Sequence, residues 1–240
     1  MTDDRQQCAP YSLGKTLTLH LAPGVLLTIM FVFVAQTVSR AGGSTYLALI
    51  LCIPLVLVPV EVGILVIERR RLGCTWRALI AGHHGPPLSL PGGVVTVALL
   101  YAIAVSAAAL GSFAGAPVLR AAERILPAWA IFSDLPAGVT PGTLWLGLAL
   151  SGLVAPIVEE MYFRGFLLPR IPVGAAWAPA VNAALFAVYH FFAPWNCAAI
   201  FAGFLPLAYY VRIRGNLIPA IIVHSLFNSV GVIAALTRIT

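Results

Sequence analysis

Long runs of apolar residues account for most of the chain, and the majority of its charged residues lie in the short segments between these runs. About 20 apolar residues suffice to carry a helix across a bilayer. The pattern therefore predicts about seven transmembrane helices, one in each run. The runs cover residues 17–38, 44–67, 92–119, 142–171, 173–195, 197–211 and 217–236, of which 197–211 is the shortest.

The composition places this chain in lipid rather than in water. Only 9% of its residues are charged and 60% are hydrophobic, whereas a soluble domain carries about 25% charged residues. Within a bilayer, backbone polar groups are satisfied by helices or closed barrels, and the runs lack the alternation of barrel strands. We therefore predict an all-α fold, a polytopic transmembrane helical bundle of about seven to eight spans. The net charge of +6 comes mostly from basic loops and indicates a membrane protein, not a nucleic acid partner.

The basic residues indicate how the helices are oriented. With seven spans and a cytoplasmic N-terminus, ten of the 14 Lys and Arg residues fall on the cytoplasmic side, and the segment ERRRLGCTWR (68–77) is the main determinant. Cytoplasmic loops of membrane proteins carry an excess of these residues. We therefore expect an integral membrane protein with a cytoplasmic N-terminus. The arginine-rich loops and alanine-rich composition favour a bacterial cytoplasmic (inner) membrane.

Three parts can be distinguished along the chain. Residues 1–16 are expected to form an N-terminal cytoplasmic tail, and residues 17–140 an N-terminal membrane region of three helices. Within that region, the proline-punctuated segment 117–136 has the character of an interfacial or re-entrant helix. If it crosses the membrane instead, the number of spans becomes eight and the C-terminus changes sides. Residues 141–240 form a helical core that holds nearly all of the unusual polar residues.

Three glutamates, Glu61, Glu159 and Glu160, lie well inside apolar runs. A charge near the bilayer centre costs at least about 2.5 kcal/mol, so such residues are candidates for function. Glu160 and Arg164 are spaced i, i+4 in the favourable order and are expected to form a structural pair. Glu159, about 100° away around the helix, is left free to act as a general base. Glu61 is expected to pair with a basic residue or a backbone group.

Two further helices carry polar pairs at the same spacing. Phe186 and His190 share one helix face, as do His224 and Asn228. The turn between the fourth and fifth runs lies near the midpoint of 159 and 190, so Glu159 and His190 are expected at similar depth in an antiparallel hairpin. Taken singly, such residues are ordinary: histidine packs in cores, and asparagine joins membrane helices. Their succession on three separate spans favours a catalytic site.

These three stretches, EEMYFR (159–164), FAVYH (186–190) and HSLFN (224–228), resemble the motifs of the CPBP family of intramembrane proteases, in the same order. That family includes the CAAX prenyl endopeptidases and the bacterial bacteriocin-processing and self-immunity (Abi-type) proteins. The resemblance covers approximately residues 142–233. The first three spans match only as generic hydrophobic helices.

The resemblance implies a glutamate-dependent peptidase that cleaves a membrane-associated protein or peptide precursor. It implies that Glu159 and His190 position and deprotonate a water, and that His224 and Asn228 donate hydrogen bonds to the developing oxyanion. By the same resemblance, Glu160, Arg164 and Phe186 support the geometry. Nothing in the sequence indicates recognition of a prenyl group. The core 141–240 is accordingly expected to be the catalytic, CPBP-like part of the chain.

Several alternatives remain open from the sequence. Glu159, His190 and His224 offer the ligand types of a catalytic zinc site, but no H-E-x-x-H motif is present, so a reaction without Zn²⁺ or another cofactor is favoured. The same buried residues could serve a proton-coupled transporter, although no inverted repeat is evident. A non-enzymatic membrane scaffold or immunity protein is the remaining alternative.

Overall fold

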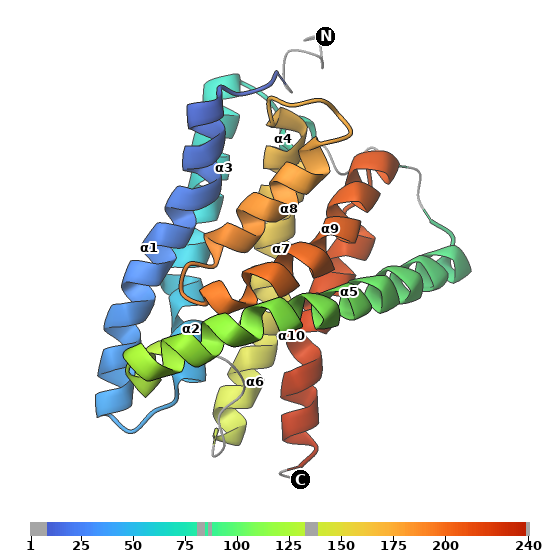
Figure 1. Ribbon diagram of the computed structural model, residues 1–240. Coiled ribbons are helices and arrows are strands. Elements are labelled where there is room, and N and C mark those ends of the chain that lie inside the picture. The colour runs from blue at the N-terminus through green and yellow to red at the C-terminus, as the bar shows by residue number, and fades with distance from the viewer. Residues whose placement is uncertain (1–8, 81–84, 86–87, 133–138, 239–240) are drawn as a thin grey trace.

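The computed structural model describes residues 9–80, 85, 88–132 and 139–238, and every regular element within these ranges is helical (Figure 1). Six helical segments of the described chain are long and apolar enough to cross a membrane. The prediction of an all-α polytopic helical bundle is therefore confirmed. The six segments are Leu13–Arg40, Thr45–Leu72, Leu90–Ile125, Pro141–Arg170, Pro194–Arg214 and Ile218–Leu236.

The first two membrane segments form a hairpin. Helix α1 begins after Ser12 and the next segment after Ser44, and each serine side chain accepts a hydrogen bond from a backbone N–H of the first turn, as N-caps do. The second segment widens into a π-helix, η2, over a stretch that contains a proline, because proline cannot donate to the regular helical ladder. The elements are α1 (Leu13–Arg40), α2 (Thr45–Cys52), η2 (Ile53–Leu57), α3 (Val58–Leu72) and the short α4 (Trp76–Leu79).

Helix α5 (Leu90–Ile125) is 36 residues long and crosses the bundle obliquely, mainly against α9 (Cys197–Arg214) (Figure 1). Glycines allow this close crossing: a Cβ at Gly111 or Gly115 would collide with backbone atoms of Ala198 or Trp195. The first part of segment 117–136 is the end of α5, and a 3₁₀ turn, η4 (Ala128–Ala130), follows it. Residues 133–138 lie outside the described residues, and the interfacial character of this segment stays a prediction.

The fourth membrane segment is one continuous rod with two π-helical stretches. It carries the first of the three motifs, and the remaining helices then fold back against it. The elements of this half are α6 (Pro141–Ala149), η5 (Leu150–Val154), α7 (Ala155–Glu159), η6 (Glu160–Leu167), η7 (Leu168–Arg170), α8 (Ala178–Tyr189), η8 (Pro194–Asn196), α9, and α10 (Ile218–Leu236).

The fifth apolar run, 173–195, contains a shorter helix than its length suggested. Helix α8 has only 12 residues, or about 18 Å at 1.5 Å per residue, which is less than a bilayer crossing requires. The chain turns at both ends of α8, and Pro194 already begins the next helical segment. The run 197–211, which was the shortest in the sequence, is extended at both ends into a 21-residue candidate span.

The N-terminal end of α1 lies beside the basic end of α3. The Lys15 ammonium is 2.9 Å from the Glu68 carboxylate, and the Tyr11 hydroxyl donates a hydrogen bond to the same group. The start of α1 and the end of α10 lie at opposite ends of the bundle (Figure 1). Of the ten residues assigned to the cytoplasmic side, Arg5 lies outside the described residues, and Arg164 and Arg170 are buried in the bundle. The orientation itself stays a prediction.

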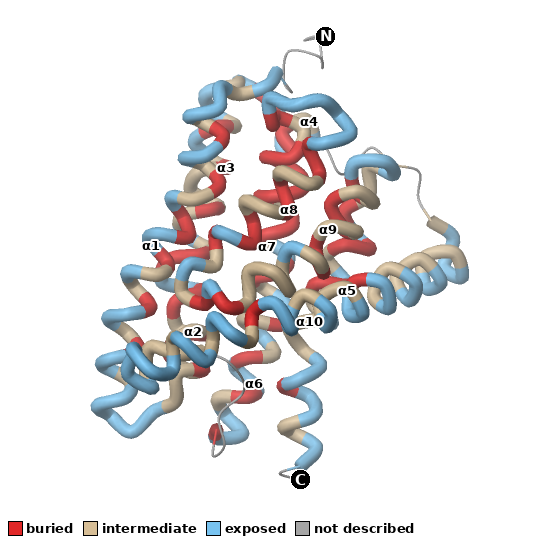
Figure 2. The backbone as a smooth tube through the Cα atoms, in the orientation of Figure 1, coloured by how far each residue is buried: buried red, intermediate tan, exposed pale blue. Residues whose placement is uncertain are grey.

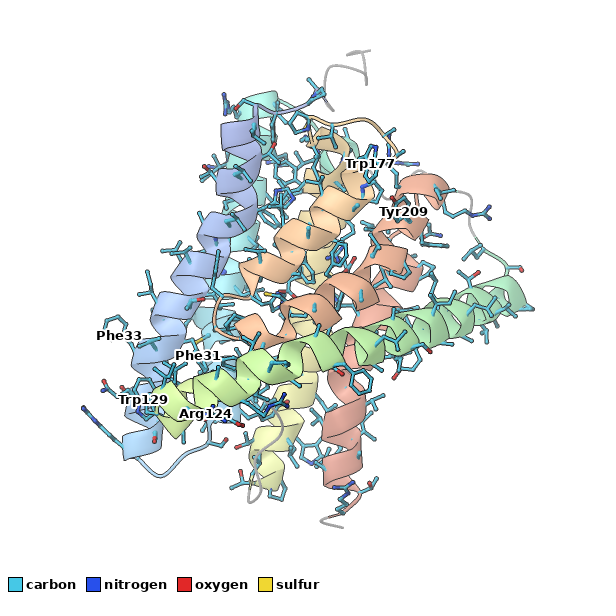
Figure 3. The ribbon with its side chains drawn as sticks, in the orientation of Figure 1. Phe31, Phe33, Arg124, Trp129, Trp177 and Tyr209 are labelled. Atoms are coloured by element: carbon cyan, nitrogen blue, oxygen red, sulfur yellow. The ribbon has the colours of Figure 1, made fainter. Side chains whose placement is uncertain are left out.

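Buried residues are concentrated where α8, α9, α3 and the η6 segment meet, whereas the outer faces of α1 and α5 are exposed (Figure 2). The exposed faces are apolar: Phe33 and Phe113 are 65% and 76% exposed. Phe33 points away from the bundle, and its near neighbour Phe31 is buried (Figure 3). Exposed apolar side chains of this extent fit helices that are surrounded by lipid.

Candidate active site

The two adjacent glutamates lie where the regular helix changes into a π-helix. Helix α7 ends at Glu159, and η6 begins at Glu160. Such π-helical segments occur frequently at functional sites. Both side chains are buried, with 4% and 0% of Glu159 and Glu160 exposed. Each therefore needs a partner or a role that compensates the loss of hydration.

Glu160 and Arg164 contact each other as their spacing predicts. Arg164 Nη1 lies 3.2 Å from Glu160 Oε1, and both side chains are fully buried. The guanidinium also lies over the ring of Phe186, with 4.1 Å from Cζ to the ring centroid. Arginine stacks on aromatic faces in this way because its planar charge is weakly hydrated. The arginine thus joins the first motif to the second.

His224 contacts both glutamates, an arrangement that the sequence analysis did not predict. Its Nδ1 lies 3.0 Å from Glu160 Oε1, and its Nε2 lies 3.6 Å from Glu159 Oε2. A carboxylate only accepts hydrogen bonds, so Nδ1 carries the hydrogen in the contact with Glu160. The third motif is thereby held against the first.

His190 directly follows the last residue of α8, and its ring nitrogen Nδ1 lies 2.8 Å from the Phe186 carbonyl oxygen. A carbonyl accepts hydrogen bonds and cannot donate them, so Nδ1 carries the hydrogen there. In the neutral ring, Nε2 then has a free lone pair. The ring stands nearly perpendicular to that of Phe186, with centroids 4.9 Å apart. His190 is therefore oriented by the turn that precedes it, and its other nitrogen is available as a proton acceptor.

Asn228 is held by the first π-helical stretch of the fourth segment. Its Nδ2 donates a hydrogen bond of 3.0 Å to the carbonyl oxygen of Ser151 in η5. The side-chain amide has two hydrogens on this nitrogen. One of them remains for another acceptor.

One cavity of about 370 Å³ brings the four predicted catalytic residues together. Glu159, His190, His224 and Asn228 all contribute to its wall, together with the carbon-rich side chains of α1, η2, α9 and α10. The supporting residues Glu160, Arg164 and Phe186 do not line this cavity. The apolar lining includes Leu27, Ile53, Leu57, Phe192, Phe204 and Phe227.

Some polar contacts of this region were not anticipated from the sequence. Glu61 accepts a hydrogen bond of 2.9 Å from the Tyr189 hydroxyl. The prediction that Glu61 pairs with a basic residue or a backbone group was therefore wrong. Asn182 donates to the carbonyl of Phe163 in η6 and contacts His20 of α1. These contacts join residues that are far apart in the sequence. The spacing of residues along one helix does not predict contacts between different helices.

Within the described ranges, no group of three or more His, Cys, Asp or Glu side chains is arranged to hold a metal ion. The alternative ligand set Glu159, His190 and His224 shares one cavity, and the Nε2 atoms of both imidazoles lack a hydrogen in their neutral forms. The donor chemistry is therefore compatible with Zn²⁺.

Comparison with protein families identifies the C-terminal half. Residues 141–230 match the family model described as Rce1-like, type II CAAX prenyl endopeptidase. The matched region contains all three motifs and every residue assigned to the site. Comparisons with curated proteins and with solved structures find no match. Residues 141–230 of this integral membrane protein are similar to the Rce1-like family, and this match is consistent with a CPBP intramembrane endopeptidase.

Proposed function

We propose that this chain hydrolyses a peptide bond of a membrane-associated protein or peptide precursor, using a water molecule activated by Glu159 and His190. The observation that carries this proposal is the convergence of Glu159, His190, His224 and Asn228 on one cavity. A general base, an orienting imidazole and two hydrogen-bond donors are the groups that water-driven acyl transfer requires.

The reaction begins with a water placed between the Glu159 carboxylate and His190 Nε2. The water oxygen attacks the carbonyl carbon, and a proton of the water passes to Glu159. His190 holds the water in the orientation that this attack requires. The tetrahedral intermediate carries its negative charge on the former carbonyl oxygen, which His224 and Asn228 stabilise. The C–N bond then breaks, and Glu159 returns the proton to the departing amine.

The contact between His224 and Glu160 specifies the form in which His224 can act. Its Nδ1 hydrogen is directed to Glu160, so a neutral ring presents only a lone pair at Nε2. Donation to an oxyanion therefore requires the imidazolium form of His224. The two adjacent carboxylates, at 3.0 and 3.6 Å, offset that charge. Glu160 thus supports the oxyanion site through its contact with His224, in addition to its ion pair with Arg164.

The lining of the cavity bears on the substrate. Most of its lining residues are apolar or aromatic, which fits a segment delivered from the bilayer better than a soluble, charged peptide. We assign the protein to a bacterial cytoplasmic membrane with a cytoplasmic N-terminus. Leader peptides, precursors of secreted peptides and membrane-anchored sorting tails are the substrate classes that this placement favours.

The test uses the full-length protein in lipid nanodiscs, incubated with a library of peptides derived from a bacterial membrane proteome. New peptide termini are identified by mass spectrometry for the wild type, for Glu159→Gln, and for the control Glu123→Gln at an exposed position of α5. We expect the same new termini with the wild type and the control, and none with Glu159→Gln. The absence of new termini with the wild type would overturn the proposal in favour of a transporter or scaffold.

The same assay tests the metal alternative. Preincubation with a zinc chelator leaves the rate unchanged if Glu159 and His190 act on water alone. Loss of cleavage on chelation, with recovery on adding Zn²⁺, would replace that mechanism with the zinc-dependent one. In that case Glu159, His190 and His224 become the ligand set.

A further inference from the structure

Glu61 is a fully buried carboxylate in the second membrane segment, outside the region that matches the Rce1-like family. Its Oε1 accepts the hydrogen bond from Tyr189, and its Oε2 is buried without a hydrogen-bond partner among the described residues. No Lys, Arg or His forms an ion pair with it in the described part of the chain. Such a residue is costly in a membrane helix.

A second glutamate on the same helix shows what a structural carboxylate looks like here. Glu68 contacts Lys15 at 2.9 Å and Arg71 at 3.5 Å, and it accepts a hydrogen bond from Tyr11. It lies near the end of α3 and is 6% exposed. Glu61 lies deeper and has one hydrogen bond. A buried charged group with so little compensation adds little to stability, because an apolar side chain would avoid its desolvation cost.

The partner of Glu61 is the residue before the proposed catalytic histidine. Tyr189 is the last residue of α8, and its ring packs edge-on against both Phe163 and His190, with centroids 5.0 and 5.1 Å apart. Its backbone carbonyl faces Gly24 of α1 so closely that a Cβ at that glycine would collide with it. Three elements, α1, α3 and η6, therefore fix the end of α8.

This placement bears on His190, because the backbone of Tyr189 leads directly into it. The Nδ1 of His190 is tied to the Phe186 carbonyl in the same turn, so the direction of Nε2 depends on how this turn is held. The carboxylate of α3 is thus connected to the cavity through the end of α8.

We propose that Glu61 and Tyr189 are positioning residues, which hold the end of α8 so that His190 Nε2 is directed to the water beside Glu159. The inference rests on the proposed function of the cavity. It makes the N-terminal half, which lies outside the family match, a contributor to the chemistry. Neither residue touches the substrate, so their effect is on the rate of the chemical step and not on substrate binding.

The experiment measures kcat and KM separately on a fluorogenic peptide that spans the cleavage site found with the peptide library. Tyr189→Phe keeps the ring and removes the hydroxyl; Glu61→Leu removes the acceptor. We expect each to lower kcat roughly 10- to 100-fold, as loss of an orienting partner does elsewhere, with KM unchanged. Glu61→Gln retains an oxygen that accepts the Tyr189 hydrogen bond, and it should recover most of the rate. The double variant Glu61→Leu/Tyr189→Phe should lose no more than either single variant.

The matched control is Tyr162→Phe. Tyr162 is equally buried, and its hydroxyl donates a hydrogen bond of 2.6 Å to the Leu19 carbonyl of α1. Its loss should lower the thermal unfolding temperature to a similar extent as Tyr189→Phe while leaving kcat unchanged. Equal kcat values for Tyr189→Phe and Tyr162→Phe would overturn the inference. So would losses in the double variant that multiply.

Glu159→Gln, assayed in parallel, separates the two proposals. If Glu159→Gln abolishes cleavage while Tyr189→Phe cleaves as the wild type does, only the positioning role is wrong. If Glu159→Gln still cleaves, the proposed function fails first and the positioning role fails with it. Loss of cleavage in Glu159→Gln together with the kcat effect in Tyr189→Phe supports both.

Discussion

The imidazole of His224 and the carboxylate of Glu160, 64 residues apart in the sequence, meet at 3.0 Å in the interior of the bundle. Glu160 also contacts Arg164 at 3.2 Å, and the Arg164 guanidinium lies over the ring of Phe186. One carboxylate therefore connects the first motif with the third directly and with the second through Arg164. The second glutamate of the motif is thus a structural centre, and Glu159 beside it faces the cavity.

This arrangement predicts that loss of the Glu160 carboxylate lowers the stability of the bundle. Glu160→Gln leaves the buried Arg164 charge without its partner, which should cost about 3–5 kcal/mol of unfolding free energy. The double variant Glu160→Gln/Arg164→Met removes both charges and should recover most of that loss without recovering cleavage. Thermal unfolding in nanodiscs measures the first quantity, and peptide cleavage measures the second. A single Glu160→Gln variant with wild-type stability would contradict the structural role.

Asn228 provides a test of the oxyanion site. Asn228→Ala removes the amide hydrogens but leaves the acceptor Ser151 in a helical segment, so the fold should persist. We expect kcat to fall about 10²- to 10³-fold, the range for loss of one oxyanion donor. Asn216→Ala, which precedes α10 and does not line the cavity, serves as the control. An equal rate in the two variants would exclude Asn228 from the oxyanion site.

Glycines at helix crossings predict steric limits on packing. A Cβ at Gly115 meets the backbone carbonyl of Trp195, which cannot rotate away as a flexible side chain would. Gly115→Val should therefore destabilise the packing of α5 against η8 by about 1–3 kcal/mol. Gly142→Val, where no atom lies within 4 Å of the added Cβ, is the comparison. Chemical crosslinking or thermal unfolding distinguishes the two, and equal stability would contradict the close crossing.

Asn182 predicts a purely structural effect. Its Nδ2 lies 2.9 Å from the Phe163 carbonyl, in the π-helical segment η6. Asn182→Leu leaves that buried acceptor without its donor, which should cost about 1–3 kcal/mol. Because Asn182 does not line the cavity, kcat per folded molecule should change little. A large fall in kcat with unchanged stability would indicate that Asn182 acts on the reaction instead.

Much of the fold and of the candidate site could be predicted from the sequence. Six of the seven apolar runs correspond to candidate membrane spans, because hydropathy and length decide whether a helix is stable in lipid. The spacing of Glu160 and Arg164 predicted their contact, since residues four apart share a helix face. The three motifs identified the region that the family model matches. Each of these is a local property of the chain.

The tertiary structure decided what local spacing cannot encode. The bond between His224 and Glu160, the hydrogen bond between Tyr189 and Glu61, and the 12-residue length of α8 all depend on how helices pack. Turn residues limit α8, although its hydropathy would have supported a longer helix. Buried polar groups take partners from whichever element packs beside them, and that choice is made by packing between residues 64 and 128 positions apart. The chain's own sequence specifies which groups must be satisfied, and the folded bundle determines which groups satisfy them.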